Sequence, residues 1–120
     1  MRKNTTLPAR RSPCPVACAL DILGDKWSLL VVRDLLLGRK RFKDFLSSPE
    51  RIPTNILSER LNRLIQRGIV SPIPLEESPG RHGYALTEKG QALQSIIQSL
   101  VKWGLEWEPD TLVNMKKMKG

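Results

Sequence analysis

The chain has 120 residues, 40% of them hydrophobic, which is the size and composition of one domain around one hydrophobic core. It carries 20 Lys and Arg against 12 Asp and Glu, and the net charge of +8 favours an anionic partner, nucleic acid first and an anionic membrane surface second. Two cysteines are too few for a disulfide scaffold. This low cysteine count makes a reducing cytoplasm the expected location. No apolar run approaches the roughly 20 residues of a membrane span, so we expect no membrane segment.

The first 13 residues are predicted to form a flexible basic arm. They contain Arg2, Lys3, Arg10 and Arg11, but no acidic residue and no apolar segment of the kind found in signal peptides. At the other end, residues 109–120 are predicted to form a basic tail. The range 14–108 between them is the expected folded domain.

Two helices are predicted at the start of this domain. Residues 15–23 place a proline in the first helical turn, where its missing N–H costs nothing, and Gly24 should end the helix. The second helix is predicted over 26–37, with Asp25 as N-cap and Gly38 as the C-terminal stop. It is apolar on nearly all sides, a pattern typical of a helix that is buried or lies between subunits.

A helix-turn-helix is predicted next. A short helix contains Phe42 and Phe45, and a longer one follows at about 54–67. The apolar residues of the longer helix recur at helical spacing and should face the core: Leu57, Leu61, Leu64 and Ile65. Gly68 should cap its C-terminus.

A β-hairpin and a closing helix complete the predicted domain. Residues 69–75 and 83–86 are the expected strands, and Pro72 should confine the first of them to a sheet edge or shorten it. Thr87 is then expected to cap one long helix that continues to about Trp107.

The polar face of the 54–67 helix is the principal candidate for reading DNA. Base edges are recognised by amides, hydroxyls and guanidinium groups. Glu59 on this face would repel phosphate unless it accepts a hydrogen bond from cytosine or orients a neighbouring arginine. A solvated helix face is the alternative, but the flanking short helix and hairpin favour DNA binding. The face also carries the candidates Thr54, Asn55, Ser58, Asn62 and Arg63.

Basic residues on both sides of this helix could hold the DNA backbone. Arg81 at the hairpin turn could enter a minor groove or pair with phosphate, although an ordinary exposed turn is nearly as well supported and two nearby acids, Glu76 and Glu77, weaken the case. The turn before the helix-turn-helix is either a phosphate clamp or a solvated run of charge. It contains Arg39, Lys40, Arg41 and Lys43.

Cys14 and Cys18 lie four residues apart on the first predicted helix. Cys18 is interpreted as a small packed residue, whereas Cys14 lies at the helix start beside the basic arm, where a thiolate is favoured. Two cysteines and one distant histidine, His82, make a poor zinc site. The chain has no Ser/His/Asp or Cys/His set and no phosphate-cradling glycine loop, so we expect no metal, no cofactor and no enzymatic activity.

The ordered set of these segments resembles one family, the HxlR-type transcription regulators. The resemblance runs from about Cys14 to about Gly104 and rests on CPV at 14–16, GDKWSLLVVRDLLL at 24–37, LSERLNRL at 57–64 and YALTEKG at 84–90. It implies homodimers, and it implies that a cysteine directly before Pro-Val senses oxidants or electrophiles in some members, a position that Cys14 occupies. The chain departs from the family at His82 and Gly83, where an apolar residue and an acid are usual. This departure predicts a later start of the second strand and a looser hairpin tip.

We therefore expect a mainly α fold with a small β-hairpin, a winged helix-turn-helix with extra terminal helices for dimerisation. The expected function is sequence-specific binding of double-stranded DNA, with a pseudo-palindromic operator, to regulate transcription. Two alternatives remain: a protein-interaction winged helix without DNA binding, and a redox or effector sensor with secondary DNA contacts. The sequence does not identify a small-molecule inducer. The expected dimer interface includes Val16, Leu20, Trp27, Leu100, Trp103 and Trp107.

Overall fold

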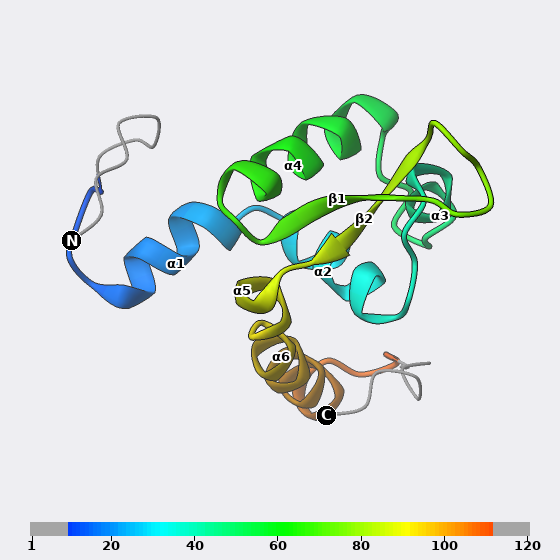
Figure 1. Ribbon diagram of the computed structural model, residues 1–120. Helices are drawn as coiled ribbons and strands as arrows, with labels where there is room; N and C mark the ends of the chain where they lie inside the picture. Colours follow the sequence, from blue (N-terminus) through cyan, green and yellow to red (C-terminus); the bar gives the residue numbers. More distant parts are fainter. Residues whose placement is uncertain (1–9, 112–120) are drawn as a thin grey trace.

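The computed structural model describes residues 10–111, which form a helical body with one projecting β-hairpin (Figure 1). In this part of the chain no helix is long and apolar enough to cross a bilayer. The elements in order are α1 (Pro15–Leu23), α2 (Ser28–Leu36), α3 (Phe42–Leu46), α4 (Thr54–Gln66), β1 (Val70–Pro74), β2 (His82–Leu86), α5 (Glu88–Gln91) and α6 (Gln94–Trp107).

Helix α2 is the centre of the core and packs against α1, α4, β2 and α6. Its residues Val31 and Val32 are 2% and 0% exposed, which agrees with the apolar pattern that predicts a buried helix. Asp25 contributes to the helix start as predicted, although the structural N-cap is Trp27. The Asp25 carboxylate accepts hydrogen bonds from the backbone N–H groups of Trp27 and Ser28, so it satisfies donors that the helix leaves free.

The helix-turn-helix consists of α3 and α4 and is confirmed at the predicted positions. Burial of one leucine stripe holds α4 on the body, and truncating such a leucine to alanine typically costs about 2–5 kcal/mol. The turn that follows α4 needs a left-handed backbone, which Gly68 supplies with φ of +75°. The stripe consists of Leu57, Leu61 and Leu64, each at most 1% exposed.

Strands β1 and β2 form an antiparallel hairpin, the wing, in which Pro72 pairs with Tyr84. The Tyr84 N–H donates to the carbonyl of Lys40, 2.8 Å away, and therefore points away from β1. In an antiparallel pair the opposing residue then also turns its N–H side outward. The position of Pro72 therefore needs no N–H donor toward β2, so the proline costs the hairpin no hydrogen bond. The expectation of an edge strand is confirmed.

The prediction of a late start for β2 is wrong. The strand begins at His82, which pairs with Pro74, and it includes Gly83. A Cβ atom at residue 83 would lie 2.5 Å from the carbonyl oxygen of Lys40 and 2.9 Å from Cδ2 of Leu75. The glycine therefore extends the strand, because it lets β2 pass close to the turn before α3.

The prediction of one long closing helix is also wrong, because the chain breaks it into α5 and α6. The N–H of Leu93 bonds to the carbonyl of Gly90, three residues back, which tightens the backbone at the junction. This turn places Leu93 and Ile97 in the core, where they are 9% and 4% exposed. The predicted cap is confirmed, since the Thr87 side chain accepts a hydrogen bond from the backbone N–H of Gly90.

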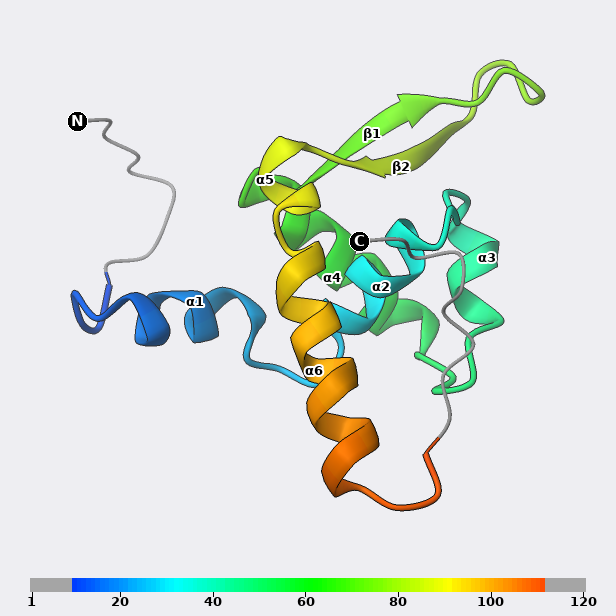
Figure 2. The ribbon, with the colours of Figure 1, turned by 90° about the horizontal axis from the view of Figure 1, so that it is seen from below.

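Helices α1 and α6 extend away from the body in different directions (Figure 2). Helix α1 reaches out on the side opposite α3, while α6 runs past α2 and continues beyond it. The predicted arm (1–13) and tail (109–120) lie mostly outside the described residues. Of the arm, Arg11 is described, and its Nε lies 2.5 Å from the Asp21 carboxylate on α1.

Candidate nucleic-acid interface

The outward side of α4 carries the side chains that the sequence predicts for base reading. They are exposed because the leucine stripe on the other side of the helix is buried in the core. Arg63 is the partial exception, with 31% of its side chain exposed. The exposed members are Thr54, Asn55, Ser58, Glu59 and Asn62.

The arginines on α4 are not free cations. Arg60 Nε donates to the Asp25 carboxylate at 2.8 Å, and its guanidinium also contacts Glu59. Arg63 lies 3.5 Å from the Glu59 carboxylate and 3.9 Å from that of Asp25. Glu59 therefore has the geometry expected of an acid that orients neighbouring arginines.

Asp25 is the most heavily bonded acid of this group. Burial by itself would raise the pKa of Asp25, but hydrogen bonds from Arg60, from Ser28 and from the backbone N–H groups of Trp27 and Ser28 outweigh it. The pKa of Asp25 therefore lies well below its ordinary value, and the group is fully ionised at neutral pH.

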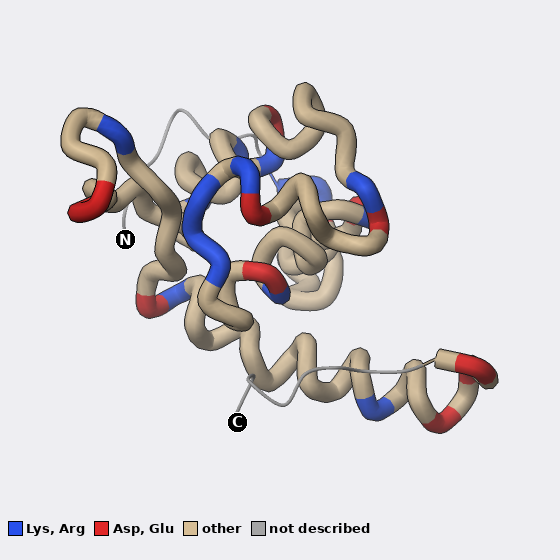
Figure 3. The backbone as a smooth tube through the Cα atoms, turned by 90° about the vertical axis from the view of Figure 1, so that its right-hand side faces the viewer, with Lys and Arg blue, Asp and Glu red and all other residues tan. Residues whose placement is uncertain are grey.

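The basic turn before α3 divides into engaged and exposed residues. Arg39 donates to the Asp34 carboxylate at 3.1 Å and to Ser48 Oγ at 2.8 Å. Arg41 pairs with Glu77 of the wing, and its guanidinium holds the pKa of that carboxyl below its usual range. Lys40 and Lys43 are exposed. Figure 3 shows the same mixture along the backbone, where basic and acidic positions lie side by side.

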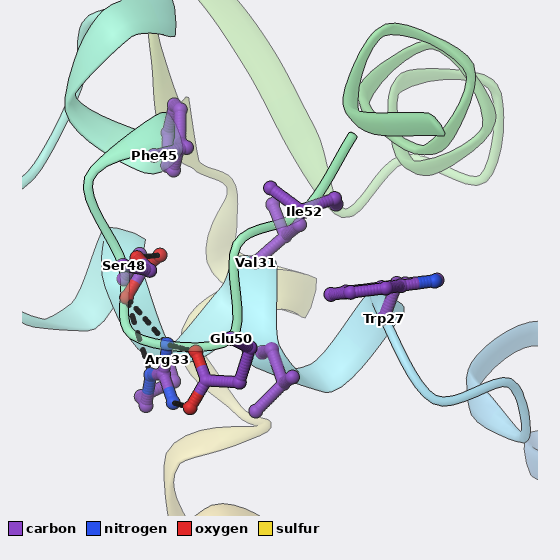
Figure 4. Close-up of a pocket in the computed structure, with 9 residues that line it drawn as sticks. Trp27, Val31, Arg33, Phe45, Ser48, Glu50 and Ile52 are labelled. Atoms are coloured by element: carbon purple, nitrogen blue, oxygen red, sulfur yellow. Dashed lines mark hydrogen bonds and ion pairs between the residues drawn. The ribbon is translucent and has the colours of Figure 1, made fainter. Parts of the chain in front are cut away.

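A buried polar junction lies beneath the turn between α3 and α4 (Figure 4). Asp34 is 3% exposed and accepts from Ser48 Oγ. Arg33 donates twice to Glu50, each time at 2.8 Å, and this contact lowers the pKa of Glu50. The cavity beside them holds only about 10 Å³, the space of one water at most. The junction therefore anchors the turn and does not form a ligand pocket.

A larger hollow of about 310 Å³ lies between the wing and the start of α3. Arg81 is exposed at the wing turn, and it lies on the same hollow as the basic turn. The wing thus brings Arg81 together with Arg41 and Lys43, which lie some 40 positions earlier in the sequence. The lining consists of Arg41, Phe42, Lys43, Leu75, Ser78, Arg81 and His82.

The two cysteines differ in their surroundings. Cys14 is exposed at the start of α1, and its backbone N–H donates to Ser12 Oγ. Cys18 is half-buried, and its thiol donates to the Ser12 carbonyl at 3.2 Å. Within residues 10–111, no group of three His, Cys, Asp or Glu side chains gathers so as to hold a metal ion.

Large apolar side chains lie exposed on the two projecting helices. Trp27 differs from the other predicted interface residues, because it is half-buried against the core with the Lys26 ammonium 5.2 Å from its ring centroid. The exposed residues among those predicted are Val16 (65%), Leu20 (54%), Leu100 (51%), Trp103 (58%) and Trp107 (63%).

Sequence reasoning missed the acid–base partners of the candidate site. Arg60 and Asp25 are 35 residues apart, and Arg41 and Glu77 are 36 apart. Helical periodicity could have flagged Arg60, since it lies next to the buried Leu61. Its partner Asp25, which lies just before α2, follows only from the packing of α2 against α4.

The family model for HxlR-like helix-turn-helix proteins matches residues 22–111. The chain belongs to this family. The regulator YodB of Bacillus subtilis is 38% identical over 107 residues, which cover 87% of this chain and 96% of YodB. A second HTH-type transcriptional regulator, MT3179 of Mycobacterium tuberculosis, is 38% identical over 94 residues, or 78% of this chain. This HxlR-like chain covers 59% of that relative's length.

Solved structures give the same architecture. A candidate transcription factor, PA1607, has a TM-score of 0.78 and 38% identity, covering 87% of the HxlR-like chain and 73% of PA1607. The reduced form of YodB has a TM-score of 0.67 and 35% identity, covering 84% of the chain and all of YodB. The winged helix-turn-helix fold and the family that the sequence resembles are thus both confirmed.

Proposed function

We propose that this HxlR-like protein binds double-stranded DNA sequence-specifically and thereby regulates transcription. The observation that carries the proposal is α4, which presents exposed amides and hydroxyls over a buried leucine stripe. A helix of this kind fits the major groove, whose base edges offer a distinct donor and acceptor pattern for each base pair. The proposal gives the protein no catalytic role and places it in the cytoplasm.

Within α4 we assign base reading to the exposed amides first. Asn55 and Asn62 can each form a bidentate pair with adenine, and Arg63 can do so with guanine. Glu59 serves this reading by orienting Arg63, 3.5 Å away. Thr54 and Ser58 can add hydroxyl contacts to bases or phosphates.

We assign backbone contacts to the hollow between the wing and α3. Lys40, Lys43 and Arg81 are exposed there or beside it and can meet phosphates without breaking an intrachain bond that holds the fold. In this proposal Arg39 has a structural role, since it bonds to Asp34 and Ser48. Arg41 contributes once its bond to Glu77 is released.

We further propose a homodimer that reads a pseudo-palindromic operator. A monomer in water would leave the exposed tryptophans of α6 and the aliphatic residues of α1 uncovered, and surfaces of this kind usually mark an interface. A twofold dimer presents two reading helices to two half-sites.

Thiol sensing at Cys14 is the regulatory part of the proposal. Cys14 is exposed at the start of α1, and the related YodB has been solved in reduced and quinone-bound forms. A soft electrophile should label Cys14 faster than Cys18, and the labelled protein should bind its operator differently. Peptide mass mapping after labelling measures this, and equal rates or unchanged binding would leave Cys14 as a packing residue.

The central test is selection of bound duplexes from a random pool, followed by affinity measurements with two classes of variant. Asn62→Ala should lose about 1–3 kcal/mol of discrimination between selected and scrambled duplexes. Lys40→Ala should weaken all duplexes alike and flatten the salt dependence, while Lys102→Ala on α6 serves as the charge-matched control. Full discrimination by Asn62→Ala would remove α4 as the reader. No shift of any duplex at low salt would favour a protein-interaction role instead.

A further inference from the structure

We propose that Asp25 determines DNA specificity by positioning the arginines of the reading helix and by tying that helix to the end of α1. The inference rests on the proposed function, in which α4 reads the operator. Asp25 itself makes no DNA contact in this scheme and acts through Arg60 and Arg63.

The contacts of Asp25 connect the start of α2 with one side of α4. One carboxylate oxygen accepts from the backbone N–H groups of Trp27 and Ser28, both at 3.0 Å, and from Arg60 Nε at 2.8 Å. The other accepts from Ser28 Oγ at 2.6 Å and faces Arg63 at 3.9 Å. The Asp25 carboxylate therefore links the start of α2 to α4.

These contacts give the two arginines different tasks. Arg60 has 16% of its side chain exposed, so it braces α4 against Asp25 instead of reaching outward. Arg63 is more exposed and lies between Asp25 and Glu59, which restricts the directions its guanidinium can take. A guanidinium that is already oriented loses less freedom on binding a guanine edge.

Asp25 also lies at the joint between α1 and α2. Helix α1 ends at Leu23, and the backbone N–H of Gly24 donates to the carbonyl of Leu20 at 2.7 Å, so Gly24 continues the end of α1 and Asp25 follows it directly. In this proposal a tilt of α1 is passed through Gly24 to Asp25, and from Asp25 to Arg60 and Arg63. This provides a short route from the exposed apolar face of α1 to the reading helix.

Asp25→Asn separates this role from helix capping. Asparagine caps helices about as well as aspartate, so the variant keeps one oxygen for the backbone N–H groups at the start of α2. It loses the charge that holds the arginines and the second accepting oxygen. Asp21→Asn is the matched control, because it removes the same charge from α1, where Asp21 pairs with Arg11.

The experiment compares the affinities of the dimeric full chain for its selected duplex and for a scrambled one. A wild-type protein that does not discriminate would contradict the proposed function and not this inference alone. With discrimination established, Asp25→Asn should reduce the affinity ratio by about tenfold, the scale of one good base contact, with scrambled-duplex affinity unchanged or higher. Asp21→Asn should keep the ratio.

Two further variants show whether Asp25 acts through the arginines. In an Arg63→Ala background, Asp25→Asn should change the ratio far less than in the wild type, because the oriented group is already missing. Arg60→Gln removes the brace from the α4 side and should lower the ratio even if Asp25→Asn folds poorly. An unchanged ratio in both Asp25→Asn and Arg60→Gln, or an equal loss in Asp21→Asn, would overturn the proposal.

Discussion

At the scale of single residues, many of the basic side chains in the described part of this protein are paired with carboxylates. All 12 acidic residues and 15 of the 20 Lys and Arg lie within residues 10–111, so this part carries a net charge of +3 and the five other basic residues supply the rest. Among the described arginines, Arg33, Arg41 and Arg60 each bond to a carboxylate. The exposed lysines and the positions of the arginines therefore matter more for binding than the net charge does.

Asp25 should make folding stability depend on pH. Its pKa is depressed in the folded state, so its stabilising effect is complete above the unfolded-state pKa of about 3.9 and is lost as pH falls through the folded value. Asp25→Asn should therefore be less stable than the wild type at pH 7, and the difference should shrink from about pH 4 downward. Urea unfolding at several pH values measures this.

The charged groups that face Asp25 are Arg60 and Arg63, with Glu59 beyond them. Glu59→Gln is a suitable control for the loss of one charge. Because the Glu59 side chain is 52% exposed, this variant should lower the free energy of unfolding at pH 7 less than Asp25→Asn does. A stability difference between wild type and Asp25→Asn that stays constant from pH 7 to about pH 2 would contradict the assignment.

Gly83 should tolerate no side chain. In Gly83→Ala the new methyl would lie 2.5 Å from the Lys40 carbonyl oxygen, a backbone atom that cannot rotate aside. We expect a loss of about 1–3 kcal/mol in the free energy of unfolding, the usual cost of overpacking. Chemical denaturation measures it, and an unchanged midpoint would show that the wing can separate from the turn before α3 without penalty.

At the scale of elements, Glu77 of the wing would compete with the DNA backbone for Arg41 in the proposed interface. Glu77 holds the guanidinium of Arg41 at the hollow between the wing and α3. Glu77→Gln should therefore raise affinity for all duplexes, because it frees Arg41 for phosphate. Glu76→Gln adds the same charge one residue away and should raise affinity less. Fluorescence anisotropy over a salt series compares them, and equal gains would reduce the effect to net charge.

Local patterns predict most elements of this fold. The leucine stripe of α4, the proline in the first turn of α1 and the Thr87 cap each lie within a few residues of the structure they specify. The break between α5 and α6 escaped prediction because no proline marks it and the apolar spacing of the closing helix begins only at Leu93, after the break. Only the packing of Leu93 and Ile97 into the core shows why the helix has to turn there.

The residues of the candidate site can be predicted from the sequence. Which of its arginines are bonded within the chain, and which are available to a ligand, cannot. The exposed amides of α4 follow from helical period alone. Whether an arginine is available to DNA depends on partners such as Glu77 for Arg41, which tertiary packing brings close. The sequence shows four basic residues in the turn 39–43, and the structure shows that two of them are bonded within the chain.

At the scale of the whole molecule, the exposed apolar faces of α1 and α6 predict a dimer. Trp103 is 58% exposed in the single chain, so Trp103→Ala should cost little in the monomer fold and about 3–5 kcal/mol where a partner subunit buries the ring. Light scattering at micromolar concentration should show a wild-type dimer and a dissociated variant. A monomeric wild type would remove the interface argument.

The base of the wing joins the C-terminal end of α4 to α5, the short helix that leads into α6. The Thr87 hydroxyl donates to the Gly68 carbonyl at 2.5 Å, and Lys89 Nζ donates to the Arg67 carbonyl at 2.7 Å. Because the end of α4 is bonded to α5, and α5 leads directly into α6, we expect α4 and α6 to turn together. The 14 residues of α6 span about 21 Å, so a pivot of about 10° shifts the far end by about 3.6 Å, close to the 3.4 Å rise of one base pair. In a dimer, a pivot of this size at the subunit interface would change the distance between the two α4 helices by about one base pair. Affinities for operators whose half-sites are one base pair closer or farther apart would then report the angle between the subunits.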